Sequence, residues 1–295
     1  MRKRILFSLI AAAVMQANAP LYSAETNLAA PASTVAVTTN SLPSHEDAEK
    51  SLTLLKARLA ARLKQGKDKE ADFADILKDF DSLLARYSKT DDDRLNILFI
   101  RAQFYLADLD DPIKALPLFE ELRKEYPDLV INSSTDLFLA GLQQHVKARQ
   151  IQNSMPPGTP FPDFDEKDLQ GNPLSVAKFK GNVVLVDFWA TWCTICVVDL
   201  PKLQKAYDTY HSKGFEVIGI SMDEDKSVLE KFIKQKKIRW PQYFEGVRFD
   251  GKLATKYAIE AAPTAFLIDR DGKIIKRLGQ TDDVAKAIEE AMKKN

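Results

Sequence analysis

The strongest constraint on the fold is an almost entirely apolar run at residues 183–190, followed closely by the pair Cys193 and Cys196. A short apolar run bounded by turn signals predicts a buried strand, and a run that is apolar on both faces favours the centre of a parallel sheet. The segment after it is compatible with a helix, which places both cysteines at the helix N-terminus. Unpaired N–H groups and the helix dipole stabilise a thiolate there, and a thiolate attacks disulfides. The pattern therefore predicts a redox-active dithiol, whose second thiol resolves the mixed disulfide formed by the first.

One residue of the apolar run, Asp187, is acidic. A carboxylate within an apolar strand is unfavourable unless it is paired or keeps its proton. Asp187 precedes Cys193 near the end of the predicted strand, where a buried acid can accept and return a proton as the second cysteine attacks. The alternative is a capped or partly exposed residue at the edge of a sheet, because structural acids also have perturbed pKa values.

The sequence from Val186 to Cys196 resembles the active-site segment of thioredoxins. Its continuation through Asp199 and Pro201 is similar to the Cys-x-x-Cys-x-x-Glu-x-Pro pattern of the TlpA/ResA-type thioredoxins, with Asp for Glu. Residues 261–272 resemble that family's Pro-Thr-x-Phe-Leu-Ile-Asp-x-Asp-Gly segment, and residues 161–174 resemble its lead-in hairpin. The resemblance covers about residues 158–295. It implies an α/β thioredoxin-like fold, with a mixed central sheet and helices on both faces.

The resemblance also implies roles for the site residues. Cys193 is expected to be exposed and to attack, and Cys196 to be more buried and to resolve, with Asp187 as the proton acceptor. Asp199 matches the family's Glu, which helps to set the pKa values of the thiols. Three further residues are expected to bind the substrate protein, with the proline in the cis form: Trp192, Ala262 and Pro263. A trans proline with a purely structural role is the alternative.

Ile195 departs from the family pattern, which usually has proline at this place. Proline lacks an N–H, whereas Ile195 has one in the first helical turn. We expect this N–H to donate to the Cys193 sulfur and to favour the thiolate, because a hydrogen bond to the charged form lowers the pKa of an acid. The protein would then be less strongly reducing than a relative with proline.

The composition excludes several kinds of protein. The chain has 295 residues, enough for two domains, and 42 basic and 42 acidic side chains, so its formal net charge is zero. A nucleic-acid-binding protein needs a basic excess on one face, so no nucleic-acid partner is expected. The chain has 2 cysteines, both in the motif, which leaves none for a structural disulfide. No cofactor and no metal is predicted.

The first residues are typical of an exported protein. Basic residues at 2–4, a short apolar segment at 5–15 and small residues up to Ala24 predict a signal peptide over residues 1–24. An uncleaved anchor is the alternative, although the apolar segment is shorter than a bilayer requires. The predicted location is therefore the periplasm or cell envelope. Residues 25–45 are rich in Ala, Thr, Ser and Pro and are expected to form a flexible linker.

Residues 46–151 have apolar residues at helical spacing and predict an all-helical domain. Within it, residues 99–127 resemble one tetratricopeptide unit, with Gln103 in the usual place of glycine. Such a domain would bind a protein partner, and a helical bundle that only packs on the catalytic domain is the alternative. Prolines and a glycine predict a linker at residues 152–160, and the thioredoxin-like domain follows at residues 161–295.

The combined prediction is an exported thiol–disulfide oxidoreductase that reduces disulfides. Its partners would be a disulfide-bearing envelope protein and a membrane thiol electron donor that re-reduces it. Three alternatives remain. A peroxidase would need Pro-x-x-x-Thr-x-x-Cys, which does not precede Cys193. A copper-delivery protein would need Cys-x-x-x-Cys and a distant histidine, whereas the histidine after the motif is His211, in the helix that begins at the motif. The third is an adaptor that uses the fold only for binding.

Overall fold

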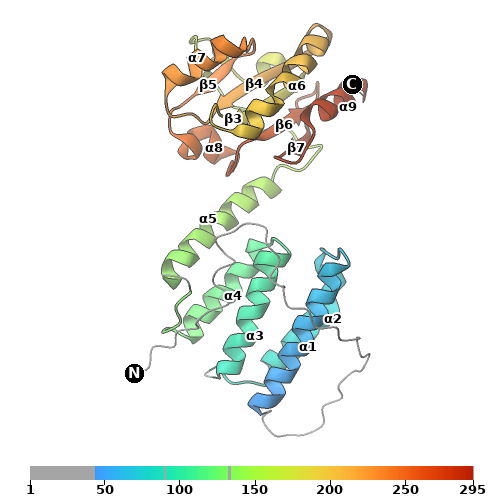
Figure 1. Cartoon of the computed structure of the whole chain (residues 1–295), viewed down its shortest axis with the longest axis vertical. Helices are drawn as coiled ribbons and strands as arrows, with labels where there is room; N and C mark the ends of the chain where they lie inside the picture. The colour runs from blue at the N-terminus through green and yellow to red at the C-terminus, as the bar shows by residue number, and fades with distance from the viewer. Residues whose placement is uncertain (1–43, 90, 132–133, 295) are drawn as a thin grey trace. The chain divides into compact units, whose positions relative to one another are not determined.

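The computed structural model describes residues 44–89, 91–131 and 134–294. It divides into two compact units. The boundary between them along the chain lies between Val146 and Lys147, within helix α5 (Figure 1). The predicted signal peptide at residues 1–24 and nearly all of the predicted linker at 25–45 lie outside the described residues. The domain and linker bounds expected from the sequence stay predictions. No helix in the described part of the chain is long and apolar enough to cross a membrane.

The first unit is helical, as the sequence predicts. Its α-helices are α1 (His45–Lys64), α2 (Ala74–Leu84), α3 (Asp92–Gln103), α4 (Pro112–Glu125) and α5 (Thr135–Asn153). A 3₁₀ turn at Glu70–Phe73 precedes α2, and a π-helical turn at Phe104–Asp108 follows α3. Helix α1 begins with a capping box, in which the Ser44 side chain accepts from the Asp47 N–H and the Asp47 carboxylate accepts from the Ser44 N–H.

The core of this unit is aromatic and aliphatic, with fully buried Phe73, Phe80 and Phe119. Ala102 of α3 and Ala115 of α4 are also fully buried. Small residues at these positions let the two helices approach closely, as a tetratricopeptide pair requires. The tetratricopeptide resemblance itself stays a prediction.

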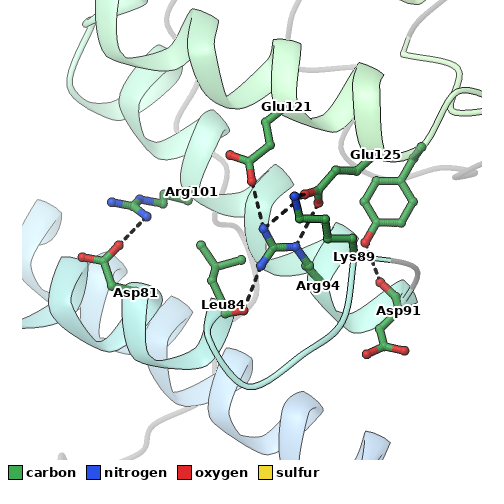
Figure 2. A network of polar contacts seen from close by, with 9 residues as sticks. Asp81, Leu84, Lys89, Asp91, Arg94, Arg101, Glu121 and Glu125 are labelled. Atoms are coloured by element: carbon green, nitrogen blue, oxygen red, sulfur yellow. Dashed lines mark hydrogen bonds and ion pairs between the residues drawn. The ribbon is translucent and has the colours of Figure 1, made fainter.

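A buried cation joins the helices of this unit (Figure 2). Arg94 of α3 donates to Glu121 at 2.8 Å and to Glu125 at 2.9 Å, both on α4, and to the Leu84 carbonyl at 2.8 Å at the end of α2. The side chains of Arg94 and Glu125 are only 12% and 5% exposed. A buried charge pair is sensitive to the loss of one partner, because the other charge is then left without compensation.

The second unit is built on a five-stranded sheet with the order β5-β4-β3-β6-β7. The strands are β3 (Val183–Trp189), β4 (Phe215–Ser221), β5 (Gln242–Phe244), β6 (Thr264–Ile268) and β7 (Ile274–Leu278). Strands β3, β4 and β5 are parallel, whereas β6 and β7 run antiparallel to their neighbours. The predicted mixed sheet is confirmed. The predicted lead-in hairpin is the antiparallel pair β1 (Glu166–Lys167) and β2 (Pro173–Leu174).

Both faces of this sheet are covered, because the apolar residues of β3 alternate between two cores. Val184, Val186 and Phe188 pack with the lead-in segment and α8 (Lys252–Lys256). Val183, Leu185 and Trp189 pack with residues of α6 (Thr194–Tyr210), α7 (Lys226–Lys236) and α9 (Val284–Lys294). Alternation along the strand therefore places Asp187 on the face that α6 and α9 cover.

Candidate active site

The two cysteines form a disulfide at the start of α6, where the sequence predicts them. Cys193 is the N-cap residue of this helix, and its Cα atom lies 5.2 Å from that of Cys196. The Cys196 N–H donates to the Cys193 sulfur at 3.2 Å. In the thiolate form this contact would stabilise the negative charge, as a side chain at an N-cap satisfies the free N–H groups of the first turn.

Two sequence-based expectations about this turn are wrong. The N–H that reaches the Cys193 sulfur belongs to Cys196, not to Ile195, because the side chain at this N-cap reaches the third amide of the helix. Cys193 is also the more buried cysteine, with 6% exposure, whereas Cys196 is partly exposed. The exposures differ because the two side chains lie in different surroundings. Cys193 belongs to the core beside α8, whereas Cys196 lines a pocket on the face that α6 and α9 cover.

This pocket brings together four of the predicted site residues. Asp187, Cys196, Asp199 and Pro263 all line it, with further apolar walls from Leu200, Leu203, Trp240 and Leu278 among others. Burial raises the pKa of Asp187 to about 7. No hydrogen bond or ion pair to its carboxyl is found among the described residues, so desolvation is not offset by a partner. The Asp199 carboxylate accepts from the Lys202 ammonium at 2.7 Å, one turn along α6.

The surface beside the disulfide is apolar. Trp192 is 47% exposed, and Ile195 and Val198, in the first turns of α6, are exposed as well. The Arg248 guanidinium lies 5.4 Å from the Trp192 ring centre, and Phe249 meets the same ring edge-on at 6.2 Å. Such a surface can receive an apolar segment of a protein substrate.

The predicted cis peptide bond is confirmed between Ala262 and Pro263. Pro263 lines the pocket with Cys196, while Ala262 packs against the core that contains Cys193. The Ala262 carbonyl accepts from the Gln280 side chain at 3.2 Å. The cis proline therefore shares a pocket with Cys196.

Sequence reasoning missed Asp223, which is buried and hydrogen-bonded to Thr191, two residues before Cys193. Hydrophobic periodicity does not distinguish it from its acidic neighbours Glu224 and Asp225. The position of Asp223 just after β4 is a usable signal. Because β4 runs parallel to β3, the residues that follow these two strands meet at the same edge of the sheet.

Comparison with known proteins agrees with this site. A family model described as the AhpC/TSA family matches residues 157–277. The thiol-disulfide oxidoreductase ResA of Bacillus thuringiensis subsp. konkukian is 32% identical over 143 residues, which cover 48% of this chain and 80% of that protein. ResA of Bacillus subtilis is 28% identical over 125 residues, covering 42% of this chain and 68% of that protein. A solved structure, the thioredoxin domain of a thiol-disulfide oxidoreductase from Bacteroides vulgatus, is 33% identical, with a TM-score of 0.41, and covers 46% of this chain and 97% of that one.

The dithiol of this chain stands at the start of α6, and Cys196 shares a pocket with Asp187. The similarity spans most of the length of the ResA relative. This chain therefore belongs to the ResA-like thiol-disulfide oxidoreductases of the AhpC/TSA family, and its second unit has the thioredoxin-like fold.

Proposed function

We propose that this protein reduces disulfide bonds of proteins in the cell envelope, with Cys193 as the attacking thiol and Cys196 as the resolving thiol. The observation that carries the proposal is the position of the dithiol. Cys193 caps α6 and accepts the Cys196 N–H, while Cys196 shares a pocket with Asp187. This arrangement supports Cys193 as the thiol that carries negative charge and Asp187 as the group that accepts the proton of Cys196.

The reaction proceeds in two exchanges. The Cys193 thiolate attacks one sulfur of the substrate disulfide, forms a mixed disulfide and releases the other substrate sulfur as a thiolate. The Cys196 thiol then loses its proton to Asp187 and attacks the Cys193 sulfur. The substrate leaves as a dithiol, and Cys193 and Cys196 are left as the disulfide. A pKa of about 7 suits Asp187 to this exchange, because a base works best near the operating pH.

The remaining site residues are proposed to bind the substrate and to adjust the thiols. Trp192 offers an exposed apolar ring, and Pro263, in a cis bond with Ala262, lines the pocket of Cys196. Asp199 lines the same pocket as Cys196 and is proposed to influence that thiol, with its charge partly compensated by Lys202.

Export, direction and partners belong to the same proposal. The predicted signal peptide at residues 1–24 supports an envelope location, and the resemblance to TlpA/ResA-type thioredoxins supports reduction. A reducing enzyme outside the cytoplasm must be reduced again, which calls for a membrane thiol electron donor. The helical unit is proposed to bind a protein partner.

Trapping tests the roles of the two cysteines. Cys196→Ser should leave Cys193 in a stable mixed disulfide with its substrate, so envelope proteins should be recovered that separate from the variant on reduction. Cys193→Ser is the matched control and should trap nothing. Wild-type protein should reduce insulin, and Cys193→Ala should not. Recovery of no disulfide-linked protein, or trapping through Cys196 instead, would contradict the assignment.

A further inference from the structure

A buried carboxylate holds the backbone that leads into the dithiol. Asp223 follows strand β4 and is 3% exposed. The Thr191 N–H lies 3.1 and 3.2 Å from its two carboxylate oxygens, and the Thr191 hydroxyl donates to Oδ1 at 2.6 Å. The Ser221 hydroxyl donates to Oδ2 at 2.7 Å. Both oxygens of Asp223 are thus hydrogen-bonded, and Thr191 directs both of its donors to this one group.

The contacts on either side of Thr191 extend this support to Cys193. The Met222 N–H donates to the Trp189 carbonyl at 2.8 Å, which joins the ends of β3 and β4. The Cys193 N–H donates to the Ala190 carbonyl at 3.2 Å and closes the turn into α6. Thr191 lies inside that turn. Its position therefore helps to decide where the Cys193 sulfur lies relative to the Cys196 N–H.

The same loop also supports the residue between Thr191 and Cys193. Glu224 accepts from the Arg248 side chain at 2.8 Å, and the Arg248 guanidinium lies over the Trp192 ring. Adjacent acids, Asp223 and Glu224, thus hold adjacent residues of the active-site segment, Thr191 directly and Trp192 through Arg248.

We propose that Asp223, acting through Thr191, is a positioning residue for thiol–disulfide exchange. In the oxidised protein the bond between Cys193 and Cys196 fixes the turn covalently. Reduction removes that bond, and the hydrogen bonds from Thr191 to Asp223 then keep the Cys193 sulfur within reach of the Cys196 N–H. The network therefore stabilises the reduced thiolate form more than the disulfide. This inference rests on the proposed attack by Cys193.

Thr191→Val tests the proposal, because valine keeps the shape and the backbone N–H but removes the hydroxyl donor. Two properties of the full-length protein are measured. The first is the pH profile of Cys193 alkylation by iodoacetamide in the reduced state. The second is the equilibrium between the dithiol and disulfide forms of the protein in a dithiothreitol buffer. The midpoint of the profile should rise by up to about one pH unit, and the equilibrium should shift up to about tenfold toward the disulfide, the size expected for a lost hydrogen bond to a charged group. Thr191→Ser, which keeps the hydroxyl, should match the wild type.

Two further variants separate positioning from other effects. Asp223→Asn should move both readouts in the same direction as Thr191→Val. A lower alkylation midpoint in Asp223→Asn would show that the carboxylate acts by its charge and would overturn the proposal. Asp225→Asn is the matched control from the same loop, since Asp225 caps α7 through Ser227 and Val228. It should cost stability and leave both readouts unchanged.

The positioning role of Asp223 and the proposed function can be contradicted independently. If Asp223→Asn does not fold, Thr191→Val and Thr191→Ser decide the question alone. Unchanged readouts in Thr191→Val would overturn the positioning role even if the wild-type protein reduces insulin. Absence of insulin reduction by the wild type would contradict the proposed function, whereas the alkylation profile needs no protein substrate and would still report on Thr191.

Discussion

Asp187→Asn should make the catalytic unit more stable, and the gain should depend on pH. Burial raises the pKa of Asp187 from 3.8 to about 7. Below about pH 4 the carboxyl is neutral in both the folded and the unfolded chain, so it does not make the free energy of unfolding depend on pH there. Between about pH 4 and about pH 7 the unfolded chain has released this proton and the folded chain still holds it. The free energy of unfolding therefore falls as the pH rises through this window, and the stability lost does not return above it.

The size of this loss follows from the same values. A difference of one pH unit between the two pKa values corresponds to about 1.4 kcal/mol, so a rise from 3.8 to about 7 amounts to about 4 kcal/mol. The amide introduced by Asp187→Asn does not titrate and escapes this loss. The unsatisfied hydrogen-bonding groups of this amide lower the free energy of unfolding by the same amount at every pH. The stability of the variant relative to the wild type should therefore be about 4 kcal/mol more favourable at about pH 8 than at about pH 4.

The assay is urea unfolding of the oxidised protein followed by tryptophan fluorescence. All 3 tryptophans, Trp189, Trp192 and Trp240, lie in the catalytic unit, so the signal reports on that unit. Asp225→Asn is the control with the opposite sign. Hydrogen bonds from Ser227 lower the pKa of Asp225, so its ionised form adds stability above the unfolded pKa, and its amide variant should lose relative stability as the pH rises. A stability difference for Asp187→Asn that is the same at both pH values would refute the reasoning.

Two further predictions concern the helical unit and the helix start. Arg94→Met should destabilise the helical unit by at most about 3–5 kcal/mol, measured by circular dichroism, because it leaves the buried Glu125 carboxylate with only the longer 3.6 Å ion pair to Lys89. The exposed pair of Arg123 with Asp136 supplies the control, since Arg123→Met should change stability by less than about 1 kcal/mol, and equal effects would contradict the prediction. Ile195→Pro should leave the alkylation midpoint of Cys193 nearly unchanged, because the Cys196 N–H donates to the sulfur and proline is tolerated in a first helical turn. A midpoint about one pH unit higher would contradict this prediction and show that the Ile195 N–H donates to the Cys193 sulfur.

The elements of the catalytic unit could be predicted closely from the sequence. The strand expected at 183–190 is Val183–Trp189, and the helix expected to begin at the two cysteines is Thr194–Tyr210. These segments combine a strong apolar pattern with motifs that fix their ends, so local signals and packing agree. The cis proline and the position of the cysteines followed from motif resemblance and were confirmed.

The exposure of the cysteines could not be predicted in the same way. Whether Cys193 or Cys196 is more open depends on residues that arrive from distant parts of the chain, such as Leu278 of β7 and Val284 of α9, which line the pocket beside Cys196. Helical spacing gives the side of α6 on which each sulfur lies. It does not give how closely the neighbouring elements cover that side, because this is decided by tertiary packing.

The contrast between Asp187 and Asp223 shows why residue type and burial alone do not assign a role. Both are acids at the end of adjacent strands of one sheet, and the structure gives them opposite surroundings. Asp187 faces a pocket, and no donor among the described residues reaches its carboxyl, so the neutral form is favoured and the proton can move. Asp223 accepts hydrogen bonds from Thr191 and Ser221, which occupy both of its carboxylate oxygens. The amide substitution should therefore stabilise the fold above about pH 7 at Asp187 and destabilise it at Asp223. Burial without a donor favours the neutral form of Asp187, whereas the donors around Asp223 make that acid a support for the backbone.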